Sequence, residues 1–195
     1  MESYEQTGKT VTADNQSARF EEAVLPHLDA AFNLARWLVR NSTDAQDLVQ
    51  EAYLRAWKGF TGFHGGDGRS WILTIVRNTC YTWLRKYSRR DITVEFDEGV
   101  HTQENSVPNP ERMFNENANR EVLEQALQQL PAEFRESIVL RELEGLSYKE
   151  ISEIAGVPVG TVMSRLARAR ARLRDCIAAV AGNGGLTCVA QTLKH

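Results

Sequence analysis

A pair of helices separated by a glycine turn, within residues 146–175, constrains the fold of this chain more than any other feature. The stretch reads LSYKEISEIAGVPVGTVMSRLARARARLRD. Ser147 is a good N-cap residue, and Glu150 stands three residues after it, which is the spacing of a capping box. Apolar residues follow at helical spacing until Gly156 ends this first helix, and a second helix is expected to begin near Thr161. A short capped helix, a glycine-containing turn and a longer helix predict a helix-turn-helix unit.

The second helix of this unit has one apolar side and one basic side when its residues are placed at about 100° intervals. The apolar stripe, which we expect to pack against the domain, comprises Val162, Leu166, Ala169 and Leu173. The opposite side carries Ser164, Arg168 and Ala171, flanked by Arg165 and Arg172 on one edge and by Arg170 and Arg174 on the other. A small or polar centre surrounded by arginines can approach the major groove of DNA, leaving the arginines for phosphates and guanine edges. A solvated surface helix is the alternative, but the capped helix and turn before the arginines favour DNA binding.

Residues 20–87 also follow helical periodicity, interrupted by the glycine-rich turn FTGFHGGDGR at 60–69, and contain no strand-like alternation of useful length. Within residues 44–58, Leu54 projects among charged residues, on the side opposite an apolar stripe. The charged neighbours are Asp47, Glu51 and Lys58, and the stripe comprises Ala45, Val49, Ala52 and Ala56, with Leu48 and Tyr53 at its edges. An apolar side chain ringed by carboxylates resembles the centre of a protein-binding patch. A single exposed leucine is also compatible with an ordinary surface.

A second unusual helical face lies within residues 71–87. Ile72, Val76, Thr79 and Trp83 are expected to face the core, whereas Thr74, Asn78, Tyr81 and Arg85 share the opposite side. The sequence has no acidic residue between Arg69 and Arg90. Aromatic groups beside cations suit the binding of unstacked single-stranded bases. A basic amphipathic helix with a purely structural aromatic core is the alternative.

The composition of the chain and its remaining segments limit the domain organisation and the class of protein that are possible. Its 195 residues, 42% hydrophobic and 25% charged, fit two small globular domains, and a net charge of −3 is compatible with nucleic-acid binding if the cations gather on two faces. Residues 91–114 are acidic, and Pro108 and Pro110 bar a regular helix there, so they predict a flexible linker or a spacer without a specific role. We expect residues 1–19 to be a disordered leader and residues 181–195 a loose tail.

Several classes of function lack a signature in the sequence. Cys80, Cys176 and Cys188 are far apart and do not form a metal-binding pattern with histidines, which favours free or buried thiols. There is no P-loop and no nucleophile constellation. The polar N-terminus has no signal core, and nothing approaches the run of roughly 18 apolar residues needed for a membrane span. We therefore expect a cytoplasmic protein without catalytic activity, cofactor, metal site or membrane insertion.

Three stretches, in this order, resemble the extracytoplasmic-function group of the sigma-70 family of bacterial RNA polymerase sigma factors. They are DAQDLVQEAYLRAW, then F-x₇-WILTIVRNTCYTWLRK, then LPAEFRESIVLRELEGLSYKEISEIAGVPVGTVMSRLARARARLR, and the match covers about residues 20–178. The resemblance implies an all-α fold of two small helical domains. Residues 20–90 would form a sigma region 2-like bundle and residues 115–180 a sigma region 4-like helix-turn-helix domain, joined by the flexible acidic linker 91–114.

The resemblance also implies a role for each surface. Residues 44–57 would grip the clamp coiled coil of the beta-prime subunit of core RNA polymerase. The chain would also contact the beta flap of the polymerase. Residues 71–90 would melt and read the minus-ten promoter element, and residues 159–174 would read the minus-thirty-five element. The polymerase-binding candidates are Asp44, Asp47, Leu48, Gln50, Glu51 and Leu54. The minus-ten candidates are Arg69, Trp71, Arg77, Asn78, Tyr81, Arg85 and Lys86. The minus-thirty-five candidates are Thr161, Met163, Ser164, Arg165, Arg168 and Arg172.

Three further expectations rest on the resemblance. The linker would enter the polymerase active-site cleft and RNA exit channel, an anti-sigma factor would hold the chain inactive, and the regulon would serve a stress response. Met163 departs from the family pattern, in which an arginine is common at this position, so no minus-thirty-five sequence is carried over. A helix-turn-helix regulator that is not a polymerase subunit is the alternative, although it leaves the Leu54 and Tyr81 faces unexplained.

Overall fold

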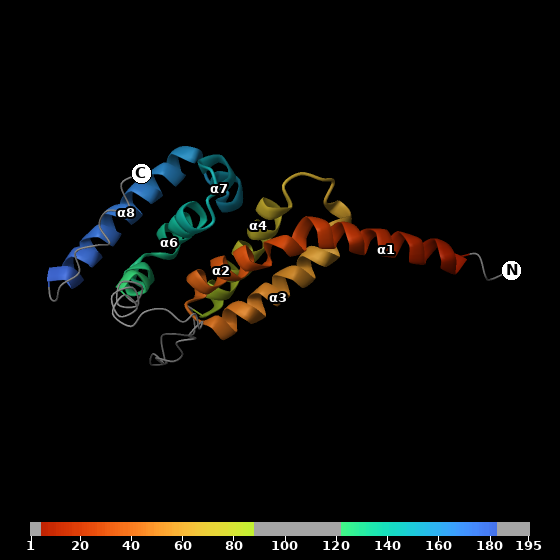
Figure 1. The fold of residues 1–195 in the computed structure, drawn as a ribbon, viewed down its shortest axis with the longest axis horizontal. Helices are drawn as coiled ribbons and strands as arrows, with labels where there is room; N and C mark the ends of the chain where they lie inside the picture. The colour runs from red at the N-terminus through yellow and green to blue at the C-terminus, as the bar shows by residue number, and fades with distance from the viewer. Residues whose placement is uncertain (1–4, 88–121, 183–195) are drawn as a thin grey trace, which may run out of the picture.

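The computed structural model describes residues 5–87 and 122–182, with side chains described for residues 15–87 and 122–178. The regular elements in these ranges are all helical, which confirms the predicted all-α fold of two domains. The first range contains α1 (Glu5–Val24), α2 (Leu28–Val39), α3 (Ser42–Gly59) and α4 (Gly68–Tyr87), with 3-10 turns at Leu25–His27 and Phe60–Gly62. The second range contains a helix at 122–129, α6 (Ala132–Ile138), a π-helical turn at Val139–Leu143, α7 (Tyr148–Ala155) and α8 (Val159–Gly182). Figure 1 shows the two sets of helices next to each other.

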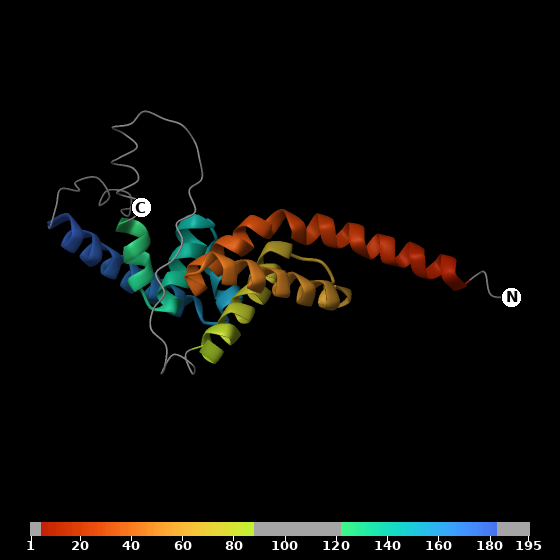
Figure 2. The ribbon, with the colours of Figure 1, turned by 90° about the horizontal axis from the view of Figure 1, so that it is seen from below.

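The first domain is built from α2, α3 and α4, which pack against one another. Its largest fully buried side chains are Leu34 and Leu38 on α2 and Ile72 and Leu73 on α4. Near the end of α1, Phe20 and Val24 are buried against this bundle. In both Figure 1 and Figure 2 the N-terminal part of α1 projects beyond the other helices.

The helix-turn-helix unit forms as the sequence predicts, because its start and stop signals are local. Ser147 Oγ accepts a hydrogen bond from the Glu150 backbone N–H at 3.2 Å, and the Glu150 carboxylate accepts one from the Ser147 backbone N–H at 2.7 Å. Gly156 ends α7 in the left-handed region, at φ 65°, where glycine is favoured. The predicted apolar stripe of α8 is at most 1% exposed, at Val162, Leu166, Ala169 and Leu173. The unit is therefore confirmed.

The turn before α4 fixes the start of that helix. The Asp67 carboxylate accepts hydrogen bonds from the backbone N–H groups of Arg69 and Ser70, at 3.0 and 3.1 Å, and from the Ser70 hydroxyl. Burial opposes ionisation of Asp67, but these hydrogen bonds hold its pKa below the ordinary value. At Gly68, a Cβ atom would lie 2.0 Å from the backbone oxygen of Ala23, so α1 and α4 approach each other more closely than a side chain allows.

Two predicted boundaries differ from the structure. Residues 5–19 of the predicted leader belong to α1, because a helix whose end is nucleated by the buried Phe20 and Val24 extends further at little cost per residue. Residues 181–182 of the predicted tail lie within α8, which continues past its last described buried side chain, Ile177. The linker 91–114, the start of the second domain at 115–121 and the tail from 183 onwards lie outside the described residues.

The two domains are packed against each other. Helix α7 contacts α4, and α6 contacts α2. Their buried apolar side chains form one continuous cluster. Both Figure 1 and Figure 2 show α6 and α7 beside the first domain, with the C-terminal half of α8 leading away from it. This packing brings the predicted minus-ten helix, α4, next to the helix-turn-helix domain.

Candidate nucleic-acid and protein interfaces

The outward face of α4 combines an aromatic ring, arginines and an amide around one hollow. The hollow has a volume of about 300 Å³ and is lined by Arg77, Asn78, Tyr81, Thr82 and Arg85. The Arg77 guanidinium lies 4.5 Å from the centre of the Tyr81 ring and donates a 3.2 Å hydrogen bond to Asn78 Oδ1. A flat ring, cations and an exposed amide are the groups that hold and recognise an unpaired base. Geometry therefore brings four of the minus-ten candidates, Arg77, Asn78, Tyr81 and Arg85, to one place.

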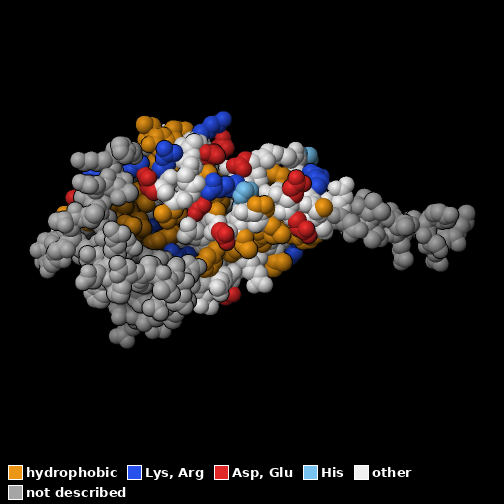
Figure 3. Space-filling model, viewed as in Figure 1, with side chains coloured by type: hydrophobic (Ala, Val, Ile, Leu, Met, Phe, Trp, Pro, Cys, Tyr) orange, Lys and Arg blue, Asp and Glu red, His pale blue; other side chains and the backbone are white. Residues whose placement is uncertain are grey.

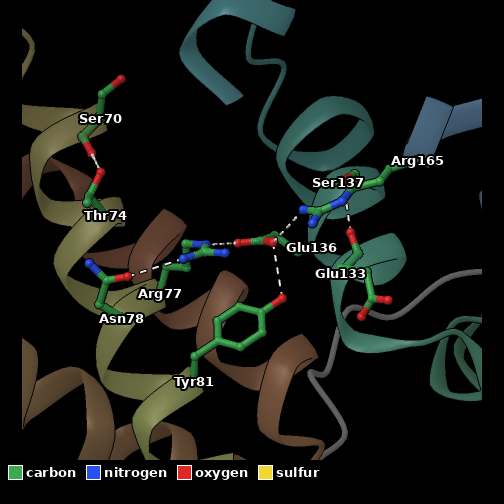
Figure 4. Close-up of polar contacts among 9 residues, drawn as sticks. All are labelled: Ser70, Thr74, Arg77, Asn78, Tyr81, Glu133, Glu136, Ser137 and Arg165. Atoms are coloured by element: carbon green, nitrogen blue, oxygen red, sulfur yellow. Dashed lines mark hydrogen bonds and ion pairs between the residues drawn. The ribbon is translucent and has the colours of Figure 1, made fainter. Parts of the chain in front are cut away.

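A carboxylate from the second domain, Glu136 of α6, reaches this face. Arg77 Nε donates to Glu136 Oε1, and the Tyr81 hydroxyl donates to Glu136 Oε2 at 3.1 Å (Figure 4). Arg165 of α8 approaches from the other side, with its Nη1 3.9 Å from Glu136 Oε2. Burial raises the pKa of Glu136 above its ordinary value, an effect that Arg77, Tyr81 and Arg165 oppose. Burial and the nearby Glu136 also raise the pKa of Tyr81, so its hydroxyl keeps the proton that it donates.

A second carboxylate, Glu144 at the end of the π-helical turn, makes a parallel set of contacts. Glu144 Oε1 accepts a 2.8 Å hydrogen bond from the Asn33 side chain of α2. Arg69 of α4 donates to Glu144 Oε2 at 2.9 Å and to the Glu144 backbone oxygen at 2.8 Å. The contacts of Glu136 with Arg77 and Tyr81, and of Glu144 with Asn33 and Arg69, join the two domains.

The remaining minus-ten candidates differ in their surroundings. Trp71 packs at 4.9 Å from Phe63 and 6.0 Å from Phe60, measured between ring centres, and is half-buried. The Trp71 ring therefore stabilises the turn before α4, which is a more direct role in this structure than contact with DNA. Lys86 is exposed near the C-terminal end of α4. Next to the hollow, Cys80 is fully buried, which raises the pKa of its thiol to about 12, so the thiol stays protonated and unreactive.

The minus-thirty-five candidates on α8 separate into exposed and engaged side chains. Met163, Ser164 and Arg168 are exposed, and Thr161 is half-buried. Arg172 is exposed, with its guanidinium 5.1 Å from the centre of the Phe134 ring.

Two residues of α8 are less exposed than the predicted face implies: Arg165, expected on one edge of the face, and Ala171, expected at its centre. Arg165 is half-buried and directed towards Glu136, because α6 lies along its side of α8 and offers the carboxylate. Ala171, predicted to point outward, is half-buried as well. On the other flank, Arg170 pairs with Glu142 at 2.6 Å. The freely exposed part of the face is therefore centred on Met163, Ser164 and Arg168.

The face of α3 matches its predicted pattern with one correction. Leu54 is 56% exposed, and Asp47, Gln50 and Glu51 are exposed around it, while Asp44 is half-buried. Leu48, included among the polymerase-binding candidates, is only 4% exposed, because it faces the packed side of α3. Leu48 is therefore part of the packed side of α3 in this structure and not of its exposed face. Burial, followed by repulsion from Asp47, raises the pKa of Asp44.

Sequence reasoning missed the residues that join the domains, and it missed Trp57. Trp57 is 39% exposed and follows Leu54 by three residues, so the two lie on the same side of α3. Glu136 stands three and four residues before Val139 and Leu140, both fully buried. A glutamate at that spacing occupies a position that faces the core, which is a signal the sequence carried. No such signal in the sequence marks Asn33 or Glu144.

Two absences apply to the part of the chain that the structure describes. None of its helices has the length and apolar character needed to cross a membrane. Within those same residues, no cluster of three or more His, Cys, Asp or Glu side chains is suited to holding a metal ion. Figure 3 shows acidic and basic side chains distributed over the described face of the molecule, with apolar groups between them.

Comparison with known proteins gives consistent matches in both domains. Residues 23–90 match the family model described as Sigma-70 region 2, and residues 120–173 match Sigma-70, region 4. The chain is 36% identical to the ECF RNA polymerase sigma factor SigE of Mycolicibacterium smegmatis over 82% of its own length and 62% of that protein's. It is 35% identical to the RNA polymerase sigma-H factor of Pseudomonas aeruginosa, over 77% of its own length and 82% of that protein's. It is 36% identical to the ECF RNA polymerase sigma-E factor of Escherichia coli K12, over 66% and 71% of the two chains.

Two solved structures are similar in fold. The sigma factor RpoE of Bartonella quintana, in complex with the anti-sigma factor NepR, aligns with a TM-score of 0.68 and 29% identity, over 82% of this chain and 97% of that one. CnrH, in complex with the cytosolic domain of CnrY, aligns with a TM-score of 0.55 and 24% identity, over 84% and 90% of the two chains, and shows the shared fold alone.

Proposed function

Since this chain belongs to the extracytoplasmic-function group of the sigma-70 family of RNA polymerase sigma factors, we propose that it binds core RNA polymerase, carries it to specific promoters and assists in melting them. It acts as a promoter-specificity subunit and not as an enzyme. The observation that carries the proposal is the co-occurrence, in one chain, of a region 2 domain with a base-sized cationic and aromatic hollow and a region 4 domain with an exposed recognition helix. Because both polymerase and promoter are cytoplasmic in bacteria, the chain acts there.

The exposed face of α3 is the proposed polymerase contact. Leu54 and Trp57 supply an apolar centre, and Asp47, Gln50 and Glu51 supply a polar rim. Buried apolar anchors surrounded by polar groups are the usual anatomy of a protein interface. The acidic character of this rim suits a basic partner surface, and the clamp coiled coil of the beta-prime subunit is the partner that family membership suggests.

The hollow on α4 is the proposed site for unpaired bases of the minus-ten element. Stacking on Tyr81 and hydrogen bonding by Asn78 supply recognition, while Arg77, Arg85 and Lys86 supply phosphate attraction. On α8, Arg168 and Ser164 are proposed to reach base edges of the minus-thirty-five element, and Arg172 to contact phosphate. Met163, 53% exposed on the same side, offers an apolar contact where a cation would otherwise attract DNA.

The proposed partners extend beyond DNA and core enzyme. The similar Bartonella quintana chain was solved with an anti-sigma factor, which supports regulation of this chain by a protein of that class. The beta flap of polymerase is the proposed contact of the region 4 domain. The acidic linker, 91–114, lies outside the described residues, and its entry into the RNA exit channel stays a prediction from the sequence.

The direct experiment is transcription initiation in a purified system. We expect the chain to co-migrate with sigma-free core polymerase in gel filtration and to initiate transcription from its own promoters without another sigma factor. Promoters can be selected from randomised DNA with the reconstituted holoenzyme. Binding of the chain to DNA alone, without stable association with core polymerase, would instead assign it to the helix-turn-helix regulators.

A further inference from the structure

The beginning of the recognition helix α8, next to the end of α7 in Figure 1, carries an exposed surface that contains no charged side chain. Met163 is 53% exposed and Val159 is 40% exposed, and their spacing of four residues places them on one side of the helix. Gly160 and Ala167, which neighbour Met163 at spacings of three and four residues, are exposed as well. We call these four residues, Val159, Gly160, Met163 and Ala167, the apolar step.

The polar side chains nearest to the apolar step leave it without a strong hydrogen-bond donor. The Ser164 hydroxyl already donates its proton to the Thr161 backbone oxygen, at 2.9 Å. Arg168 follows Met163 by five residues, which turns it about 140° around the helix axis, towards another part of the surface. A single exposed methionine is ordinary on a protein surface. Here, however, the exposed methionine lies among small residues, within the residues that match Sigma-70, region 4.

The chemistry of the major groove offers one group that suits such a surface. Among the groups that base pairs present there, the 5-methyl group of thymine is the apolar one, whereas guanine, adenine and cytosine present hydrogen-bonding groups. A thioether has no donor for the N7 and O6 atoms of guanine, but its unbranched chain adapts readily to an apolar contact. A Cβ atom at Gly160 would meet nothing within 4 Å, so the space beside Met163 is open to an approaching base edge.

We propose that Met163 reads the 5-methyl group of one thymine in the minus-thirty-five element, and that the rest of the apolar step encloses this methyl group. The inference rests on the proposed function, because it names the chemical group that α8 recognises at one position of the promoter. Arg168 reads a different base pair, through hydrogen bonds. At the position that Met163 contacts, the chain selects thymine by apolar contact and therefore discriminates against uracil, which has the same hydrogen-bonding groups without the methyl group.

Replacing thymine by deoxyuridine tests this contact directly, because it removes the methyl group and leaves the hydrogen-bonding groups of the base pair in place. The minus-thirty-five element is first selected from randomised DNA with holoenzyme reconstituted from the full chain and core polymerase. Each thymine of the selected element is then replaced singly by deoxyuridine, and the affinity of the holoenzyme is measured. We expect one replacement to weaken binding about fourfold, the value for one buried carbon, and the others to have little effect.

Variants of the chain connect this effect to Met163. We expect Met163→Ala to bind the thymine and uracil DNAs equally well, and Met163→Leu, which keeps an apolar side chain, to retain a preference for thymine. Leu143→Ala is the matched control, because Leu143 is a 48% exposed apolar residue of the same domain that lies outside α8, and it is expected to keep the fourfold ratio. Each protein is compared with itself on two DNAs, so differences in polymerase binding cancel in the ratio.

Three results would overturn the assignment: a selected element without thymine, a parent chain that tolerates deoxyuridine at every position, or a fourfold ratio that persists in Met163→Ala. If Met163→Ala loses helicity by circular dichroism, Met163→Gln takes its place, because it keeps the length of the side chain and replaces its apolar end by an amide. A holoenzyme that selects no DNA sequence would instead overturn the proposed function, so the failures of the two proposals are distinguishable.

Discussion

Replacing two leucines six residues apart on α3 should have opposite consequences. Leu54 is 56% exposed and lies at the centre of the proposed polymerase contact, whereas Leu48 is 4% exposed and faces the bundle. We expect Leu54→Ala to weaken polymerase binding while the fold persists, and to weaken it further when combined with Asp47→Ala. We expect Leu48→Ala to destabilise the fold.

The magnitudes follow from the burial of each side chain. Removing the exposed part of Leu54 deletes two to three carbons that a partner would bury, at about 0.8 kcal/mol each. That amounts to about 1.6–2.4 kcal/mol of binding free energy, or roughly a fifteenfold to sixtyfold loss of affinity. The free energy of unfolding should fall by less than about 1 kcal/mol. For the buried Leu48, loss of contacts and the cavity left behind predict a fall of about 2–5 kcal/mol in the free energy of unfolding.

The assay pairs a titration of labelled chain against sigma-free core polymerase with urea unfolding of each variant. Arg55→Ala is the matched control, because Arg55 is exposed on the same helix and its ion pair with Glu51 contributes little. Unchanged polymerase affinity for Leu54→Ala would refute the assignment of this face. A loss of stability in Leu54→Ala as large as that in Leu48→Ala would refute the reasoning from exposure.

Three further predictions test local features. Gly68→Ala should lower the free energy of unfolding by about 1–3 kcal/mol, measured in urea, because its methyl group would overlap the backbone of Ala23. Arg168→Ala should relax sequence preference at the minus-thirty-five element, whereas Arg172→Ala should weaken binding to all DNA sequences alike and reduce the slope of log affinity against log salt concentration by about one. The measurement is selection of binding sequences from randomised DNA at two salt concentrations, and identical selected sequences and slopes for the two variants would contradict these separate roles. Asp67 has a pKa below its ordinary value despite its burial, so its contribution to stability is present at neutral pH and is lost as the pH falls through that lowered pKa; in Asp67→Asn this part of the acid unfolding curve should disappear.

Local features of the fold could be predicted from the sequence because their causes lie within a few residues of one another. The capping box of Ser147 and Glu150, the stop at Gly156 and the buried stripe of α8 depend on spacings of three or four residues. The exposure of Leu54 followed from the same periodicity. Such features are fixed by helix geometry before the domains meet.

Features that depend on contacts between distant residues could not be read in this way. Arg77 and Glu136 are 59 residues apart, and Arg69 and Glu144 are 75 residues apart. A helical wheel assigns Arg165 to a flank of α8, but it cannot tell which neighbouring helix covers that flank. The wheel also placed Leu48 at the edge of the buried stripe, where the difference between a half-exposed and a buried side chain is set by the packing of other helices.

Glu136 links the second domain to the first through a buried carboxylate. Its position, three and four residues before the buried Val139 and Leu140, is one that an apolar side chain usually occupies. The carboxylate is tolerated there because Arg77 and Tyr81 replace the water that it loses. Loss of either partner would leave a buried carboxylate without compensation, so this contact depends on residues of both domains.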